Sequence, residues 1–117
     1  MNTIVNKPWG NYQVLDQGNN YLTKKIYVKP NGKLSLQSHN HRSEHWTVVD
    51  GKATVSIDEN KYNLGINESI YVPLGSKHRI ENNSGKKLVI IEVQIGEILK
   101  EDDIIRYQDI YGRKISS

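Results

Sequence analysis

The sequence predicts a single all-β domain, a sandwich or barrel of short strands joined by tight turns. Turn signals recur at short intervals, among them Pro30-Asn31-Gly32 and Asn82-Asn83-Ser84-Gly85. A length of 117 residues favours one domain with a modest core. Between the turns lie seven short segments rich in Val, Ile, Tyr and Thr, which favour strands: YLTKKIYV, KLSLQSH, EHWTVV, KATVSI, KYNL, SIYV and KLVIIEVQI.

Taken in order, the first of these strands covers residues 21–28 and follows an N-terminal arm of about residues 1–12. Asp50-Gly51, between the third and fourth segments, predicts a β-hairpin because Asp-Gly supplies the positive φ angles of a type I′ turn. A C-terminal tail of about residues 97–117 follows the last strand. Within it, Glu101-Asp102-Asp103 would place negative charge at the start of a short helical segment.

Composition narrows the classes of function. The formal charge of +3 comes from 16 Lys and Arg against 13 Asp and Glu, and the basic residues are scattered. This favours an anionic small molecule over nucleic acid, which requires a concentrated basic face. The absence of cysteine excludes disulfides and thiolate ligands. With neither an apolar leader segment nor an apolar run near 18 residues, we expect a soluble cytoplasmic protein without membrane contact.

The stretch QSHNHRSEHW, residues 37–46, holds three of the four histidines of the chain. Side chains of a strand alternate between its two faces, so the preceding segment would split into a leucine face and a polar face. The leucine face would need cover from another layer or a second subunit, which predicts a homodimer. The leucine face comprises Leu34, Leu36 and Ser38, and the polar face comprises Ser35, Gln37, His39 and His41.

The polar face predicts a metal site. His39 and His41, two residues apart on a strand, would present two imidazoles side by side, and Glu44 could return its carboxylate to the same centre. His78 is the remaining histidine and would approach from a later strand, while Gln37 could add a carbonyl oxygen. Such a set suits a divalent ion, with zinc expected first and manganese, cobalt, nickel or iron as alternatives.

Two motifs resemble the cupin family. The stretch from Gly32 to Gly51 resembles the first cupin motif, and Pro73-x-Gly75-x-x-His78-x-x-x-Asn82 resembles the second. The resemblance implies a double-stranded β-helix, the cupin jelly-roll barrel, with a metal inside. Only two residues separate His41 from Glu44, where the general motif has three or four. This departure leaves open which of Gln37, His41 and Glu44 complete the metal site with His39 and His78.

Four longer stretches resemble the C-terminal cupin domain of type II mannose-6-phosphate isomerases, which is commonly fused behind a mannose-1-phosphate guanylyltransferase. They run from about Lys7 to Arg113 and include LSLQSHNHRSEHW and IEVQIGEILKEDDIIRYQDIYGR, although Ser38 and Asn40 depart from the family pattern. The resemblance implies a metal-dependent isomerase that interconverts mannose 6-phosphate and fructose 6-phosphate. No Gly-rich nucleotide-binding loop occurs, so we expect no nucleotidyl transfer by this chain.

An isomerase of this kind would need a base and a phosphate site. Glu81, Glu92, Asp109 or a metal-bound hydroxide could act as the base. The family signature DIIRYQDIYGR implies active-site roles for Arg106 and Arg113. A phosphate needs arginine or lysine, and a sugar ring often stacks on an aromatic side chain. The remaining candidates for contact with a phosphorylated sugar are Arg42, Lys77, Arg79, Trp46 and Tyr71.

Two other functions fit the same residues. The cavity could hold a sugar or sugar nucleotide without turnover, or the metal could serve another cupin chemistry, such as dioxygenation. Turnover distinguishes the binding module from the isomerase, and iron with oxygen consumption identifies a dioxygenase.

Overall fold

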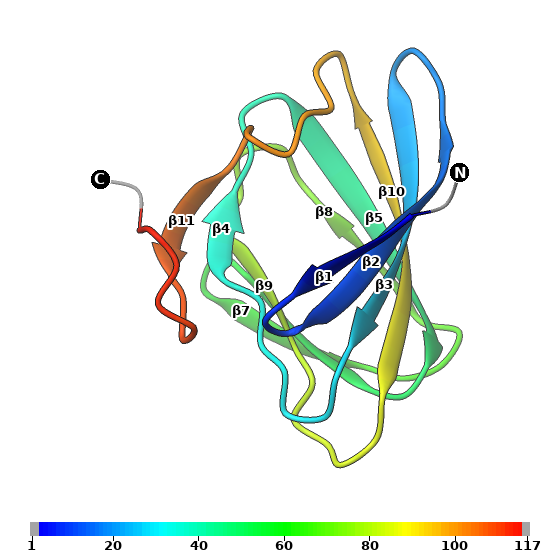
Figure 1. The fold of residues 1–117 in the computed structure, drawn as a ribbon, viewed down its shortest axis with the longest axis vertical. Helices are drawn as coiled ribbons and strands as arrows, with labels where there is room; N and C mark the ends of the chain where they lie inside the picture. Colours follow the sequence, from blue (N-terminus) through cyan, green and yellow to red (C-terminus); the bar gives the residue numbers. More distant parts are fainter. Residues whose placement is uncertain (1–2, 116–117) are drawn as a thin grey trace.

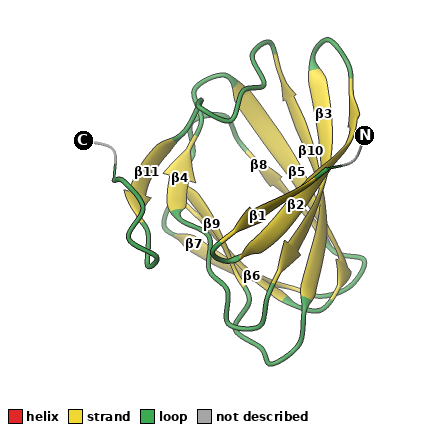
Figure 2. Cartoon of the chain, in the orientation of Figure 1, coloured by secondary structure: helices red, strands yellow, loops and turns green. Residues whose placement is uncertain are grey.

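The computed structural model describes residues 3–115 as two antiparallel sheets that face each other as a barrel (Figures 1 and 2). The large sheet has the order β1-β2-β3-β10-β5-β8, and the small sheet has the order β11-β4-β9-β6-β7. The large sheet comprises β1 (Ile4–Lys7), β2 (Gly10–Gln17), β3 (Tyr21–Val28), β10 (Leu88–Gly96), β5 (Arg42–Asp50) and β8 (Ser69–Val72). The small sheet comprises β11 (Ile105–Gln108), β4 (Leu36–Ser38), β9 (His78–Glu81), β6 (Ala53–Ile57) and β7 (Asn60–Leu64).

The all-β prediction is confirmed, but the predicted C-terminal helix is wrong. Residues 101–102 form a turn, and β11 then pairs with β4, with Ile105 opposite Ser38 and Arg106 opposite Gln37. Pairing of this kind satisfies backbone groups that β4 would otherwise leave open at its edge, which a short helix could not do. Within residues 3–115 no helix occurs, and thus none that could span a membrane.

Asp50-Gly51 does not close a hairpin. β5 pairs with β10 and β8, whereas β6 pairs with β7 and β9, so this turn carries the chain from the large sheet to the small one. Gly51 has φ +83°, and an added Cβ would lie 2.3 Å from the carbonyl oxygen of Lys87. Of the two positive φ angles expected for a type I′ turn, the one at Gly51 is present and the one at Asp50 is not, and the turn serves a crossing between sheets.

The predicted N-terminal arm is itself a hairpin for most of its length, with residues 1–2 outside the described part. Lys7 pairs with Gly10 across the turn Pro8-Trp9, and Trp9 and Tyr12 are buried in the core. The arm therefore belongs to the large sheet.

The predicted leucine face is covered from within the chain. Leu34 packs against the core cluster, and the half-buried Leu36 pairs with Gln108 of β11. The homodimer remains a prediction, but these leucines no longer require a second subunit.

Inward positions of the strands fill the space between the sheets. On β3, Leu22, Lys24, Ile26 and Val28 are buried while the residues between them are half-buried or exposed. Leu22, Ile26 and Val28 are buried apolar side chains, whereas Lys24 places an ammonium group in the barrel interior. A polar cavity in that interior is the candidate site.

Candidate metal centre

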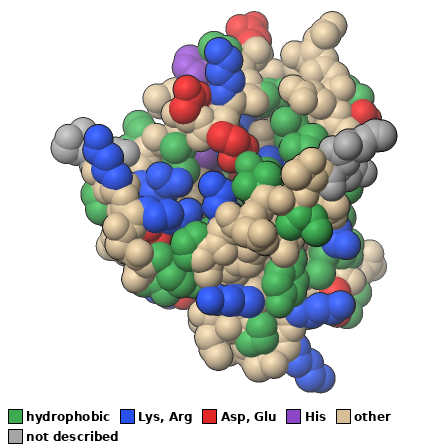
Figure 3. Space-filling model, viewed as in Figure 1, with side chains coloured by type: hydrophobic (Ala, Val, Ile, Leu, Met, Phe, Trp, Pro, Cys, Tyr) green, Lys and Arg blue, Asp and Glu red, His purple; other side chains and the backbone are tan. Residues whose placement is uncertain are grey.

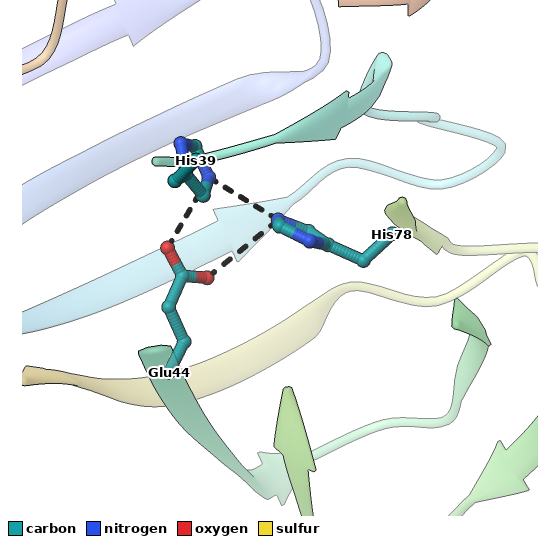
Figure 4. A group of neighbouring side chains, drawn as sticks. All are labelled: His39, Glu44 and His78. Atoms are coloured by element: carbon teal, nitrogen blue, oxygen red, sulfur yellow. Dashed lines mark hydrogen bonds and ion pairs between the residues drawn. The ribbon is translucent and has the colours of Figure 1, made fainter. Parts of the chain in front are cut away.

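Three buried side chains from separate parts of the chain converge in the barrel (Figure 4). His39 follows β4, Glu44 lies on β5, and His78 begins β9. The Nε2 atoms of His39 and His78 are 3.2 Å apart, and the Glu44 carboxylate oxygens lie 3.3 Å and 3.9 Å from these two nitrogens respectively. One possible ligand atom from each residue lies within 4.8 Å of the others, so the group can hold a metal ion.

Backbone carbonyls orient both imidazoles. Nδ1 of His39 lies 2.6 Å from the carbonyl oxygen of Asp103, and Nδ1 of His78 lies 3.1 Å from that of Ser76. A carbonyl oxygen only accepts a hydrogen bond, so each Nδ1 carries the proton and each Nε2 offers its lone pair to the centre. Burial, joined for His39 by the nearby Arg42, lowers the pKa of each histidine to about 4. Neutral imidazoles facing a carboxylate fit a divalent cation.

Arg42 compensates the buried charge of this group. Its Nε donates to Glu44 Oε2 at 2.7 Å, and its Nη2 lies 3.1 Å from Nε2 of His39. A buried carboxylate without such a partner would be costly. Arg42, predicted as a ligand contact, therefore belongs to the immediate surroundings of the metal centre.

A second buried carboxylate lies beside the first. Trp46 Nε1 donates to both Glu44 Oε1 at 3.1 Å and Glu92 Oε2 at 3.0 Å, and Gln94 Nε2 donates to Glu92 Oε1 at 2.8 Å. Burial raises the pKa of Glu92 to about 7, and the neighbouring Glu44 contributes to this rise. Glu92 can thus hold a proton near neutral pH inside the barrel.

The cavity beside the metal group has an excess of positive charge. Figure 3 shows Lys and Arg side chains gathered around a hollow, with acidic and histidine side chains next to them. The cavity volume is about 110 Å³, which is room for several water molecules. Its charged and histidine lining comprises Lys7, Lys24, Arg42, Arg79, Arg106, Arg113, Glu44, Glu92, Glu101 and His78.

Several predicted site residues meet in this cavity. Gln37 lines it and is the β-ladder partner of His78, while its amide nitrogen donates to Ser35 Oγ at 3.0 Å. Trp46, a predicted contact for the sugar, is buried and also lines the cavity. Gln37 as a ligand of the metal stays a prediction.

Arg79 and Arg113, both predicted as site residues, lie in the cavity wall. Other residues of the chain already orient their guanidinium groups. Arg79 donates to the backbone carbonyl of Leu34 at 2.8 Å and to Gln108 at 3.2 Å, and Arg113 forms a two-pronged pair with Asp109 at 2.8 Å and 3.2 Å. This pair is the first cause of the lowered pKa of Asp109. Asp109, a candidate base, thus binds an arginine and is not part of the cavity lining.

His41 is not brought to the centre. It is exposed, and its backbone N–H donates to Asp103 Oδ2 at 3.0 Å. The expected side-by-side imidazoles require a strand through residue 41, but β4 ends at Ser38 and the chain bends at residues 40–41. Strand alternation therefore does not apply to this pair.

Three further candidates also lie away from the cavity lining. Glu81 pairs with Lys33 at 3.5 Å. Lys77 is exposed, with its ammonium 4.5 Å from the centre of the Tyr107 ring. Tyr71 is 52% exposed because it points outward from β8, so it does not border the cavity with Trp46.

Lys24 and Glu101 line the cavity but were missed as candidates. A signal for Lys24 is present in the sequence, because it alternates in step with the apolar residues Leu22 and Ile26 and so shares their inward face. Nothing comparable marks Glu101, whose position depends on the path of the C-terminal segment.

Solved structures similar to this chain support the fold. The capsular polysaccharide assembling protein CapF from Staphylococcus aureus aligns with a TM-score of 0.77 at 18% identity, covering 89% of this chain and 32% of that protein. The cupin domain of Schizosaccharomyces pombe Cnp3 aligns with a TM-score of 0.71 at 11% identity, covering 74% and 64%. At these identities the likeness shows a cupin fold, as the motifs implied.

Relatives found by sequence share a much higher identity with this chain than these solved structures do. The alginate biosynthesis protein AlgA of Pseudomonas syringae pv. tomato is 52% identical over 109 residues, and the mannose-1-phosphate guanylyltransferase of Escherichia coli K12 is 51% identical over 109 residues. Each match covers 93% of this chain but 23% of the relative. The chain therefore spans about a quarter of the length of the curated relatives it matches.

These names correct the predicted activity. Relatives at 50% identity or above carry the names mannose-1-phosphate guanylyltransferase, alginate biosynthesis protein and xanthan biosynthesis protein, not mannose-6-phosphate isomerase. The prediction that this chain is an isomerase of mannose 6-phosphate is therefore wrong, because it transferred an activity from a resemblance of motifs.

Family membership follows from the extent of the match. Residues 1–109 match the family described as mannose-6-phosphate isomerase C-terminal, which is nearly the whole chain. This chain belongs to the mannose-6-phosphate isomerase C-terminal family, within the cupin fold.

Proposed function

We propose that this domain binds a phosphorylated sugar in its barrel cavity, beside a divalent metal ion held by His39, Glu44 and His78. The observation that carries the proposal is the junction of a His/Glu/His group with a cavity rich in Lys and Arg. A neutral sugar needs no such charge excess, whereas a phosphate does.

Zinc is the first ion to test at this centre, since two imidazoles and a carboxylate are ordinary zinc ligands. Manganese, cobalt, nickel and iron are the alternatives, and the carbonyl oxygen of Gln37 is the proposed fourth donor. When bound, the ion supplies a Lewis acid that attracts a hydroxyl or carbonyl oxygen of the sugar. The chain itself supplies oriented imidazoles and a compensating guanidinium at Arg42.

Mannose 1-phosphate is the first ligand to test. Two relatives carry the name mannose-1-phosphate guanylyltransferase, which names a mannose phosphate as what those proteins act on. In this cavity, Arg79 and Arg113 present guanidiniums fixed by Gln108 and Asp109, so little side-chain entropy remains to be lost on binding. Trp46 offers an indole ring near the same charges.

Isothermal titration calorimetry tests the proposal. Zinc-loaded protein and chelator-treated protein are each titrated with mannose 1-phosphate, mannose and inorganic phosphate. We expect mannose 1-phosphate to bind the zinc-loaded protein more tightly than either fragment, because only the whole ligand uses both the cations and the metal. Chelation should weaken the binding, and zinc should restore it.

A matched pair of variants locates the binding. Arg106→Gln removes a charge from the cavity lining, and Lys77→Gln removes an exposed one. Arg106→Gln should weaken mannose 1-phosphate binding, and Lys77→Gln should not. Equal affinity for mannose and mannose 1-phosphate, or equal effects of the two variants, would refute phosphate recognition in this cavity.

A further inference from the structure

The Lys24 ammonium is an unusual feature of the cavity wall. Its side chain is 6% exposed, it lies over the Tyr12 ring at 4.0 Å from the ring centre, and it lines the cavity that adjoins the metal group. A buried ammonium is costly without a charged partner. Within the described residues, this ammonium forms a close ion pair with the carboxylate of Glu101.

Glu101 is placed there by the strap, which we define as residues 97–104. The strap is held on both sides of Glu101: the Asp103 carboxylate accepts hydrogen bonds from the backbone N–H groups of Asn40 at 2.9 Å and His41 at 3.0 Å, and the Lys100 carbonyl accepts one from Arg42 Nη1 at 3.4 Å. The Glu101 side chain is 55% exposed although its carboxylate is held by the buried Lys24. The carboxylate can therefore move into water, but the ammonium cannot.

The charges around Glu101 are those of an anion site. Burial alone would raise the pKa of Glu101, but Lys24, Arg42 and Lys7 lower it. All three cations also line the cavity. One carboxylate of the chain thus sits in the combined field of three basic side chains at the cavity.

We propose that Lys24 is the point that recognises the anionic group of the ligand, and that Glu101 is an internal substitute which this group displaces. The inference rests on the proposed function and specifies one site within it. A phosphate carries more charge than a carboxylate and offers three oxygens, so it is the stronger partner for Lys24. Exchange keeps the buried ammonium paired throughout and frees Glu101 to water, while Asp103 still holds the strap.

Glu101→Gln is the central test, with Glu97→Gln as the matched control. Both substitutions remove one negative charge from an exposed strap residue, but only Glu101 pairs with Lys24. Without the competing carboxylate, Glu101→Gln should bind mannose 1-phosphate about tenfold more tightly, since binding no longer has to displace an internal partner. Glu97→Gln should match the wild type.

Lys24→Gln and Lys24→Arg complete the set. Lys24→Gln should weaken binding of mannose 1-phosphate by about tenfold or more through loss of a charge-assisted contact, and Lys24→Arg should retain most of it. Circular dichroism and zinc content show whether each variant is folded. Because Glu101 is exposed, its variant remains informative even if Lys24→Gln fails to fold.

The outcomes separate this inference from the proposed function. If the wild type binds mannose 1-phosphate and Glu101→Gln binds no more tightly than Glu97→Gln, displacement is refuted while the proposed function stands. A purely structural ion pair would give that result together with a lower melting temperature for Glu101→Gln. If neither the wild type nor Glu101→Gln binds, both proposals are overturned. Binding by Glu101→Gln alone would support the displacement.

Discussion

The metal centre and the basic wall of the cavity differ in how the chain holds them. At the metal centre, backbone carbonyls of Asp103 and Ser76 fix the two imidazoles. In the basic wall, side-chain ion pairs hold two of the cations, Arg113 with Asp109 and Lys24 with the exposed Glu101. Backbone contacts remain when a ligand enters, whereas the exposed Glu101 carboxylate can leave Lys24. We infer that the metal group is preorganised, and that the basic wall can change partners at Lys24.

The largest effect expected from this difference is on metal binding. His78→Ala removes a ligand whose Nε2 lies 3.2 Å from that of His39, so zinc affinity should fall by at least about 100-fold. His45→Ala is the matched control, since His45 is exposed and stacks near Tyr71 on the outer face. Metal analysis after dialysis against a zinc buffer measures the difference. Equal zinc content in the two variants would show that His78 does not bind the metal.

A smaller loss is expected from the basic wall. Arg106→Gln should weaken mannose 1-phosphate binding by about tenfold, the usual scale of one charge-assisted hydrogen bond, while zinc content stays unchanged. Calorimetry and metal analysis on the same sample check both expectations. A variant that lost zinc as well would show that the two regions are not independent.

The pH dependence of stability probes the buried groups of the metal-free protein. Between pH 4.5 and 6.5 the unfolded chain protonates His39 and His78, whose pKa in the fold is about 4, so this effect lowers stability as the pH falls. Glu92, with a pKa of about 7, acts oppositely, because the fold holds its proton and stability is gained as the pH falls. Two protons against one leave a net loss of stability on acidification, on the order of 1 kcal/mol per pH unit.

Glu92→Gln sharpens this measurement. It removes the opposing effect, so the loss of stability on acidification should become steeper. Urea unfolding of chelator-treated protein at pH 6.5 and 5 gives both slopes. A wild type that gained stability toward pH 5 would contradict the neutral state of the histidines.

The smallest effect is expected at Asp103, which contacts His39 of the metal centre and lies on the strap that carries Glu101. Its carbonyl, not its carboxylate, contacts His39. Asp103→Asn should therefore lower zinc affinity by less than about tenfold, although it weakens the hydrogen bonds to Asn40 and His41. Asp102→Asn, at the exposed neighbouring position, serves as the control in the same zinc titration. A loss as large as that of His78→Ala would show that the carboxylate itself holds the centre.

Sequence patterns predicted the elements that local chemistry determines. Short β-rich segments and turn residues predicted the strands, because alternation and turn geometry depend on neighbouring residues. The resemblance of two motifs to a known family implied that His39 and His78 meet, with Gln37, His41 and Glu44 left as alternatives for the remaining donors, and the structure brings Glu44 to them.

Features that depend on distant contacts were not predictable in this way. The segment that begins at Glu101 resembles a helix start locally, yet residues 101–102 form a turn and Ile105–Gln108 pair with β4 as an edge strand. Asp50-Gly51 has the chemistry of a hairpin turn, but pairing of β5 with β10 sends the chain to the other sheet. His41 was misplaced because alternation was extended beyond the end of β4, and Glu101 reaches Lys24 across 77 positions.

An anomalous-scattering map from crystals of zinc-loaded protein grown with mannose 1-phosphate tests the central claim most directly. We predict one zinc peak about 2.0–2.2 Å from Nε2 of His39, Nε2 of His78 and a carboxylate oxygen of Glu44, with the phosphate among the basic side chains of the same cavity. Zinc at the exposed His41 or His45, with the buried group free of metal and the ligand outside the barrel, would contradict the account.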